Sequence, residues 1–280
     1  MRVTFWGVRG SVATPGPETS AIGGNTSCVQ VTCSDGTEIV LDCGTGVRAL
    51  GNLHVASRPP GAVSILVTHH HFDHVEGLRF YAPIFLSDFA LDLYPLPAPL
   101  GKKQSSPLDQ FNGTTFPMKT DALVSKINQK IERREKFRIG PATISRLPLN
   151  HPGGASGIRI AEGGRSVCYM TDDELNPPNG HITTPKEIAS FVRETDLLIH
   201  DAQYVPSDYP AKRGWGHSLV EEVLELAIAA RCQRLALFHH DPSRTDEQVF
   251  AIERDARARM RDRGFPGDVF AAREGVSVKL

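Results

Sequence analysis

The sequence predicts an α/β fold in which two β-sheets pack together and helices cover their outer faces. Short apolar runs separated by glycines fill the first half of the chain, and similar runs alternate with longer amphipathic segments in the second half. A chain of 280 residues with 40% hydrophobic content is long enough to bury a large core. We therefore expect a single domain over residues 1–280.

The first half is predicted to consist mainly of strands, which span 2–7, 27–33, 37–44 and 63–69. A helix is expected to begin within 75–81. Residues 82–140 are proline-rich and irregular in pattern, and we expect an insertion there. Long irregular segments inside compact domains are usually functional loops.

The second half is predicted to alternate strands with helices. The expected strands span 141–147, 157–170, 196–202, 234–242 and 269–280, and the expected helices 185–194, 218–232 and 244–263. This pattern favours helices that lie on the outside of the packed sheets.

The composition is that of an ordinary soluble protein. Lys and Arg total 31 against 32 Asp and Glu, which gives a net charge of −1 and no bulk attraction to nucleic acid or anionic membranes. The N-terminus lacks the apolar stretch of a signal peptide, and no run is long enough to span a membrane. The five cysteines contain no CxxC pair, which argues against a disulfide framework or a zinc–thiolate site. We expect a cytoplasmic protein.

Polar side chains follow several predicted strands at the point where each strand ends. These strand-ending residues are His69, His151, Asp172, His200, Asp201 and His239. Packed sheets bring such ends together at one rim, and clustered polar groups are costly there unless they bind something. Histidine with aspartate is the ligand set of borderline divalent metals.

The spacing within 69–74 divides the ligands between two ions. Side chains two apart on an extended segment point to the same side, and the residues on the following turn can face a second ion. The predicted ligands are His69, His71 and His151 for one ion, Asp73, His74 and His239 for the other, and Asp172 between them. Two adjacent divalent ions can activate water at neutral pH and stabilise the oxygens of a reacting group.

Two neighbouring histidines compete with these ligands. His70 lies between two residues that point to the same side, so it should point away. His240 competes with His239, but Leu235, Leu237 and His239 share one face of their strand, and we favour His239.

The segment THHHFDH, 68–74, resembles the T-H-x-H-x-D-H signature of the metallo-β-lactamase superfamily. NHPGGASG, YMTDDE and LFHHDP match its later histidine, bridging aspartate and last histidine in order. Within that superfamily FWGVRGS, LLIHDAQY and KRGWGHS resemble the branch of ribonuclease Z and the cyclic phosphodiesterases related to phosphoribosyl cyclic phosphate hydrolase. The resemblance implies an αββα sandwich of mixed sheets with two divalent metal ions, Zn²⁺ or Mn²⁺.

The same resemblance assigns catalytic roles. His217 resembles the residue that protonates the leaving alkoxide, and Asp201 the carboxylate that orients it, although a histidine before a helix can also be purely structural. Asp73 is expected to orient the nucleophile as well as bind metal. The loop 9–27, with Arg9, is expected to meet the substrate. DCGTG, 42–46, is expected to form a structural turn.

The substrate expected from this branch is a small phosphodiester, such as a cyclic nucleotide or a cyclic ribose phosphate. Ribonuclease Z proteins carry a basic, glycine-rich arm that 82–140 lacks, so nucleic acid is not favoured as a partner. Three alternative functions remain: a ribonuclease Z-like tRNA 3′-end endonuclease, a thioesterase or lactonase, and a catalytically silent metal-bound sensor. We expect no membrane partner, and a homodimer in which 82–140 reaches a neighbouring site is a hypothesis from this branch.

Overall fold

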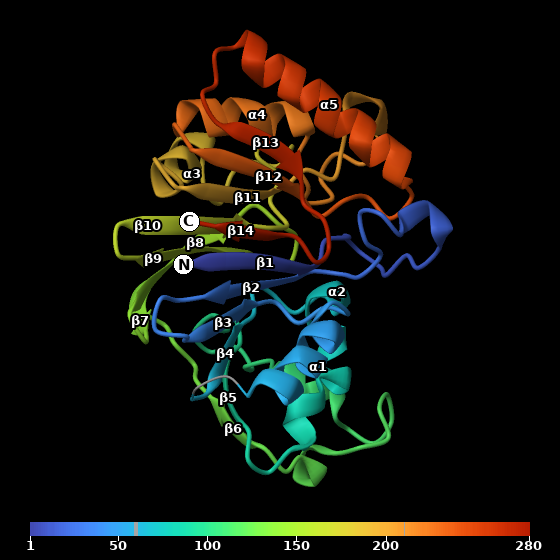
Figure 1. The fold of residues 1–280 in the computed structure, drawn as a ribbon, viewed down its shortest axis with the longest axis vertical. Coiled ribbons are helices and arrows are strands. Elements are labelled where there is room, and N and C mark those ends of the chain that lie inside the picture. The colour runs from blue at the N-terminus through green and yellow to red at the C-terminus, as the bar shows by residue number, and fades with distance from the viewer. Residues whose placement is uncertain (59–60, 210) are drawn as a thin grey trace.

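Two seven-stranded sheets face each other in the computed structural model, which describes residues 1–58, 61–209 and 211–280. Helices cover the outer face of each sheet, and both chain termini lie near the middle of the molecule (Figure 1). This is the predicted sandwich, and both sheets mix parallel and antiparallel neighbours.

The first sheet has the order β14-β1-β2-β3-β4-β5-β6. Its strands are β1 (Arg2–Gly7), β2 (Cys28–Thr32), β3 (Glu38–Leu41), β4 (Val63–Leu66), β5 (Ala90–Tyr94), β6 (Lys126–Gln129) and β14 (Ser277–Lys279). The second sheet has the order β13-β12-β11-β10-β9-β8-β7. Its strands are β7 (Lys136–Ile139), β8 (Ala142–Leu149), β9 (Ala155–Glu162), β10 (Arg165–Met170), β11 (Leu197–Asp201), β12 (Arg234–Phe238) and β13 (Asp268–Ala271).

The facing sides of the two sheets form the central core. Phe238 packs its ring against Phe5 of the other sheet at 6.3 Å between ring centroids and against Tyr169 at 5.4 Å. All three side chains are fully buried. Burying aromatic rings of this size contributes strongly to stability. Helices cover the outer faces, so strands such as β4 and β11 are buried on both sides and read as nearly continuous apolar runs.

The helices are α1 (Val47–Ser57), α2 (Phe72–Val75), α3 (Pro185–Phe191), α4 (Val220–Ala229) and α5 (Asp246–Asp262). Helix α1 covers the first sheet, and α3, α4 and α5 cover the second (Figure 1). Thr184 and Thr245 begin α3 and α5 with capping boxes, in which the threonine side chain accepts a backbone N–H of the first turn.

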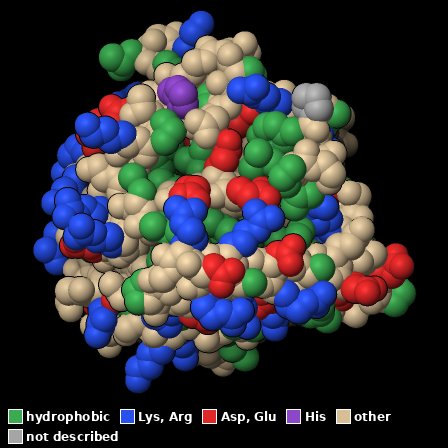
Figure 2. Space-filling view, turned by 90° about the horizontal axis from the view of Figure 1, so that it is seen from above, with side chains coloured by type: hydrophobic (Ala, Val, Ile, Leu, Met, Phe, Trp, Pro, Cys, Tyr) green, Lys and Arg blue, Asp and Glu red, His purple; other side chains and the backbone are tan. Residues whose placement is uncertain are grey.

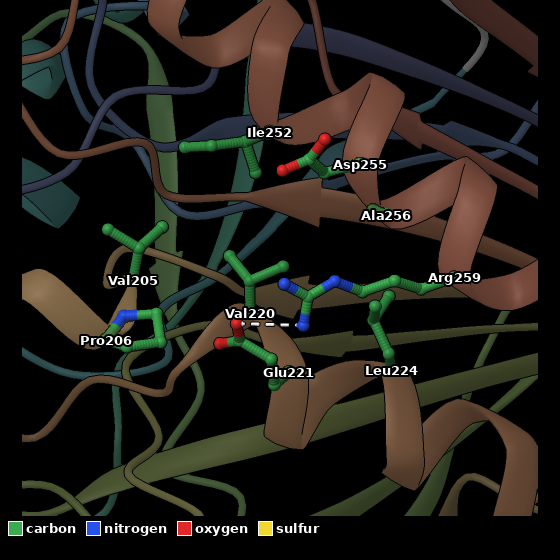
Figure 3. Close-up of a pocket in the computed structure, with 9 residues that line it drawn as sticks. All are labelled: Val205, Pro206, Val220, Glu221, Leu224, Ile252, Asp255, Ala256 and Arg259. Atoms are coloured by element: carbon green, nitrogen blue, oxygen red, sulfur yellow. Dashed lines mark hydrogen bonds and ion pairs between the residues drawn. The ribbon is translucent and has the colours of Figure 1, made fainter.

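The outer layer of the second sheet is hollowed between α4 and α5. Charged side chains lie among apolar side chains on this face (Figure 2). A groove of about 250 Å³ there is lined by Val220, Leu224 and Ala256 among others, and an ion pair of 3.0 Å between Glu221 and Arg259 spans it (Figure 3). None of the predicted site residues lines this groove.

Several expectations about secondary structure were wrong. The strand expected over 269–280 is two strands of different sheets, β13 and β14, and 157–170 is divided between β9 and β10. The structure forms helix α1 over 47–57, where no helix was expected. The helix expected within 75–81 is the short α2 followed by a 3₁₀ turn at Glu76–Phe80. The segment 82–140 is irregular only in part, because it supplies β5, β6 and β7. Among the described residues, no helix is long and apolar enough to cross a membrane.

Candidate metal centre

The strand ends meet at one rim, as the sequence suggested. The loop after β4 carries the cluster 69–74, and β8, β10 and β12 end just before His151, Asp172 and His239. Ligand atoms of His69, His71, His151 and Asp172 lie within 4.8 Å of one another, and so do those of Asp73, His74, Asp172 and His239. The structure thus brings all seven predicted ligands into two groups that share Asp172. That they bind metal is a proposal taken up below.

Asp172 lies between the two groups, and each of its oxygens faces one of them. Its Oδ1 atom is 3.0 Å from His74 Nε2 and 3.2 Å from His239 Nε2. Its Oδ2 atom is 3.6 Å from the Nε2 atoms of His69 and His151. This is the geometry of a carboxylate that can bridge two ions.

Hydrogen bonds on the far side of three rings fix which nitrogen faces the site. His74 Nδ1 donates to Asp42 Oδ2 at 2.8 Å, His151 Nδ1 to the Gly216 carbonyl at 3.0 Å, and His239 Nδ1 to Gln203 Oε1 at 2.8 Å. Because these partners only accept, each Nδ1 carries the hydrogen and each Nε2 presents a lone pair inward.

The residues fit a pair of cations. Nε2 lone pairs of buried rings face carboxylate oxygens, an arrangement that is repulsive until a positive charge lies between them. His69 Nε2 and His74 Nε2 are buried and make no hydrogen bond to any described residue. Burial holds the pKa of His69 well below its usual value. Burial opposes ionisation of Asp172, but the surrounding imidazoles hold its pKa well below the usual range. Burial also favours the neutral form of His74, yet the carboxylates of Asp172, Asp73 and Asp42 raise its pKa well above the usual value. A proton on His74 therefore supplies positive charge at the place where an ion would otherwise lie. A neutral imidazole and a charged carboxylate are the forms that bind metal.

The backbone turns sharply where it delivers these side chains. Asp42, Asp172 and His239 have φ values of 60°, 55° and 59°, in the left-handed region that non-glycine residues rarely adopt. Each follows the last residues of a strand, so the turn directs its side chain into the site. Strained backbone of this kind costs about 1–3 kcal/mol per residue and occurs mostly at functional sites.

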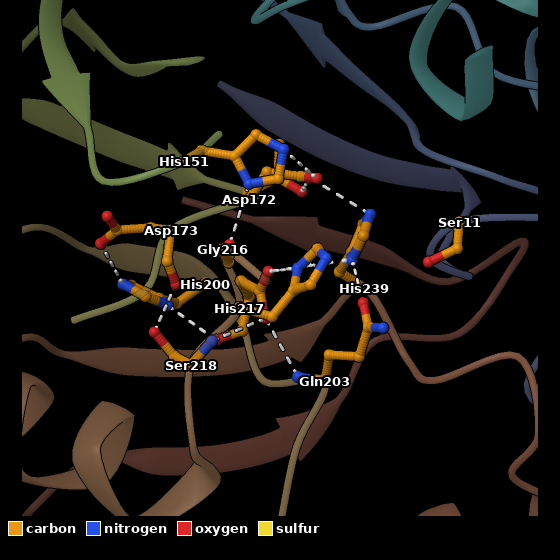
Figure 4. A network of polar contacts seen from close by, with 12 residues as sticks. Ser11, His151, Asp172, Asp173, His200, Gln203, Gly216, His217, Ser218 and His239 are labelled. Atoms are coloured by element: carbon orange, nitrogen blue, oxygen red, sulfur yellow. Dashed lines mark hydrogen bonds and ion pairs between the residues drawn. The ribbon is translucent and has the colours of Figure 1, made fainter. Parts of the chain in front are cut away.

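His217 and Asp201 form a hydrogen-bonded pair beside the second group. His217 Nδ1 donates to Asp201 Oδ2 at 2.6 Å, and the His217 ring stacks on His239 at 5.1 Å between centroids (Figure 4). Burial favours the neutral ring, but the Asp201 carboxylate raises the pKa of His217 to about 9. The pair can therefore present a proton at the edge of the site.

The competing histidines and the N-terminal loop can now be placed. His240 lies outside both groups, and its Nε2 donates to the Ala272 carbonyl at 3.0 Å. His70 is also outside both groups. The expectation for Arg9 was wrong, because its guanidinium is fully buried and donates to the carbonyls of Gly23 and Arg244, each at 2.8 Å. It anchors the loop and does not face the site.

Three residues of the site were missed or misread in the sequence. Asp42 accepts hydrogen bonds from His74, Thr68 and Tyr169, so the DCGTG segment orients a ligand as well as forming a turn. Gln203 orients His239. Glu174 accepts the backbone N–H groups of Gly214 and Gly216, which lie just before His217. Only Asp42 has a signal in the sequence, because it ends an apolar strand as the predicted ligands do.

The model of the β-lactamase superfamily domain matches residues 37–240. The chain therefore belongs to this superfamily, and with the two sheets and the His/Asp groups its fold is that of the metallo-β-lactamase hydrolases.

Its relatives are distant in sequence but extend over nearly the whole chain. Ribonuclease Z of Thermoplasma volcanium is 24% identical over 94% of this chain and 93% of its own length. The metallo-β-lactamase fold protein YhfI from Bacillus subtilis aligns with a TM-score of 0.69 at 20% identity, covering 99% and 98% of the two chains. A diphosphatase from the PhnP family aligns with a TM-score of 0.65 at 16% identity, covering 100% and 97%. These structural likenesses show the fold.

Proposed function

We propose that this chain is a phosphodiesterase that uses two divalent metal ions, Zn²⁺ or Mn²⁺, to hydrolyse a small phosphodiester such as a cyclic nucleotide or a cyclic ribose phosphate. The observation that carries the proposal is the His217–Asp201 pair, held at 2.6 Å beside the two ligand groups. Phosphodiester hydrolysis needs a proton for the departing alkoxide, and a positioned side chain can supply it as a general acid.

The residues divide the work as follows. His69, His71 and His151 would hold one ion, Asp73, His74 and His239 the other, and Asp172 both. When bound, the ions would activate water and neutralise charge on the phosphate oxygens. Asp73 is held in place by the Ser11 backbone N–H, which donates to its Oδ2 at 2.8 Å, and that contact leaves Oδ1 to orient the attacking water. His217 would protonate the leaving oxygen while Asp201 keeps its ring in place.

A ribonuclease Z-like endonuclease is the second candidate, favoured by the curated relative named above. The structure and composition of 82–140 argue against this candidate. This segment adds β5 beside β4 in parallel register, with Leu91 opposite Val63, and β6 beside β5. These strands fix both ends of the segment, and the longer stretch between β5 and β6 contains only two glycines and the lysines Lys102, Lys103 and Lys119. That stretch therefore lacks the basic, glycine-rich composition of an arm that grips an RNA.

The test is hydrolysis of bis(p-nitrophenyl) phosphate by protein loaded with Zn²⁺ or Mn²⁺, with metal content measured in parallel. Asp73→Asn removes a carboxylate of the site and should therefore reduce turnover by about 10²-fold or more. It should also lower the metal content. Asp121→Asn, the same change at an exposed 3₁₀ turn, should do neither.

Cyclic nucleotides, cyclic ribose phosphates and precursor tRNA, assayed with the same preparations, separate the two candidates. Turnover of the small diesters by protein that leaves precursor tRNA uncut supports the proposal. Cleavage of precursor tRNA without turnover of the small diesters supports the nuclease. Protein that carries two ions per chain but cleaves only thioesters or lactones, or nothing, would contradict both.

A further inference from the structure

A hollow of about 150 Å³ lies directly beside His151 at the rim of the candidate metal centre. Its wall is formed by His151, Pro152, Pro177, Pro178, Ile182 and Gly214, together with Asn150 and Glu174. A substrate whose phosphate lies at the ligand groups would extend its remaining part into a space of this kind, because hydrolytic sites usually hold the non-reacting part of the substrate in an adjoining concavity.

Two polar residues of the wall, Asn150 and Glu174, are already engaged within the protein, and a third, Asn179, is exposed. Asn150 Oδ1 accepts the backbone N–H groups of Ile182 and Thr183 at 2.7 and 3.0 Å, and its Nδ2 donates to the Thr183 carbonyl. Glu174 accepts Gly214 N–H at 2.8 Å and Gly216 N–H at 3.0 Å, one with each oxygen. The hollow therefore offers a ligand mainly prolines, Ile182 and the face of His151, with the Asn179 amide as its exposed polar group.

An exposed tryptophan stands on the loop that closes one side of the hollow. Trp215 is 59% exposed, between Gly214 in the wall and Gly216, whose carbonyl accepts His151 Nδ1. The loop is fixed at both glycines by Glu174, so the indole is held near the site without being buried. Ile182, which lines the hollow itself, is 63% exposed. Two large apolar side chains exposed at the rim of one hollow are typical of a binding surface.

We propose that this hollow, with Trp215 and Ile182 at its rim, binds a planar aromatic group of the substrate by stacking and apolar contact. The inference rests on the proposed function, in that the phosphate of the same ligand would lie at the metal ions. Because Asn150 and Glu174 are engaged within the protein, we expect little discrimination between one aromatic group and another beyond what the Asn179 amide supplies. A nucleobase and a simple aryl ring share this chemistry.

The first test uses fluorescence and needs no turnover. The chain has two tryptophans, and Trp6 lies in β1, where it donates to Gln30. Trp6→Phe therefore leaves Trp215 as the single reporter. The metal-loaded variant is titrated with adenosine monophosphate, uridine monophosphate, phenyl phosphate and methyl phosphate. Stacking is worth about tenfold in affinity or more, so the aromatic ligands should quench Trp215 and bind at least that much tighter than methyl phosphate.

Variants at the rim identify the surface. Trp215→Ala and Ile182→Ala, with binding followed by calorimetry, should each remove most of the advantage of the aromatic ligands and leave methyl phosphate unchanged. Val124→Ala, another exposed apolar residue, is the matched control. Phenyl phosphate binding as tightly as the nucleotides supports a simple aryl group, and tighter nucleotide binding supports a nucleobase.

The proposal is overturned if methyl phosphate binds as tightly as the aromatic ligands, or if the rim variants weaken all ligands equally. Its failure is distinct from that of the proposed function. Aromatic monophosphates that quench Trp215 in a protein that hydrolyses no phosphodiester would leave the subsite standing and remove the phosphodiesterase. Phosphodiester turnover without any aromatic preference would do the opposite.

Discussion

Replacing His217 by glutamine should slow the reaction to an extent that depends on the leaving group. The His217 ring donates to Asp201 at 2.6 Å and stacks on His239, so the pair is placed to deliver a proton and not to hold the phosphate. An alkoxide leaves poorly without a proton, whereas p-nitrophenolate is a stable anion. A general acid contributes about 10²–10⁴-fold, so kcat for an alkyl diester should fall by that factor and kcat for bis(p-nitrophenyl) phosphate only a few-fold.

The assay compares the two substrates in one preparation, with cyclic nucleotide hydrolysis followed by chromatography and nitrophenolate release by absorbance. His181→Gln, an exposed histidine given the same change, should affect neither substrate. Metal content must match that of the unaltered protein, since the ring also lies against His239. An equal loss on both substrates would refute the reasoning and make His217 a residue that only holds the site together.

Three further predictions concern stability and loop geometry. Burial lowers the pKa of His54 from 6.5 to about 4, so as pH falls this histidine is protonated first in the unfolded chain. The free energy of unfolding should therefore decrease by about 3 kcal/mol as pH falls from about 6.5 to about 4. Urea titrations of His54→Leu should show a flatter slope over that range; an unchanged slope would assign the loss to other groups. Glu174→Gln would place a side-chain N–H against a backbone N–H of Gly214 or Gly216, and the free energy of unfolding should fall by about 1–3 kcal/mol in the same assay. An unchanged free energy would show that the Glu174 contacts are dispensable. Gly216→Ala should lower both stability and kcat, because the residue has φ +91° and an added Cβ would lie 2.3 Å from His151 Nδ1; full activity would contradict this.

The predicted ligands could be found from the sequence because each is local to a strong signal. His69, His151, Asp172 and His239 all follow an apolar run closely, and the convergence of strand ends at one rim is a property of packed sheets. Nothing about the intervening loops had to be known. Strand alternation also placed His239 ahead of His240, and His239 does lie in the second group. In the structure, however, His239 lies one residue past β12, and its left-handed φ directs the side chain inward.

The residues that orient the ligands could not be found in this way. Asp42 meets His74 across 32 positions of sequence, and Gln203 meets His239 across 36. Asp42 ends an apolar strand, which marks its position but does not identify its partner, and a glutamine after a strand is common in any chain. Their role exists only in the folded contact, where each accepts the hydrogen of one ring nitrogen and thereby directs the other at the site.

Helix α1 could not be predicted from the sequence, because a residue that its packing requires weakens its helical pattern. Its sequence contains Gly51, which weakens a helix by about 1 kcal/mol relative to alanine and obscures the periodic pattern. A Cβ at that position would lie 2.9 Å from Tyr81 Cδ2, so the close approach of Tyr81 requires glycine. His54 then donates to or accepts from Tyr81 Oη at 2.6 Å. Tertiary contacts therefore stabilise a helix that local propensity alone does not predict.

Arg9 shows why a residue type near a predicted site does not establish its role. A guanidinium in a glycine-rich loop is a natural phosphate ligand, yet here it is enclosed, paired with Asp246 at 3.4 Å and bonded to two carbonyls. Asp246 in turn accepts the N–H groups of Ala21 and Ile22. The buried charge thus joins the loop to the start of α5, and the loop carries the Ser11 N–H that holds Asp73. Its contribution to the site is one of position, transmitted through the backbone.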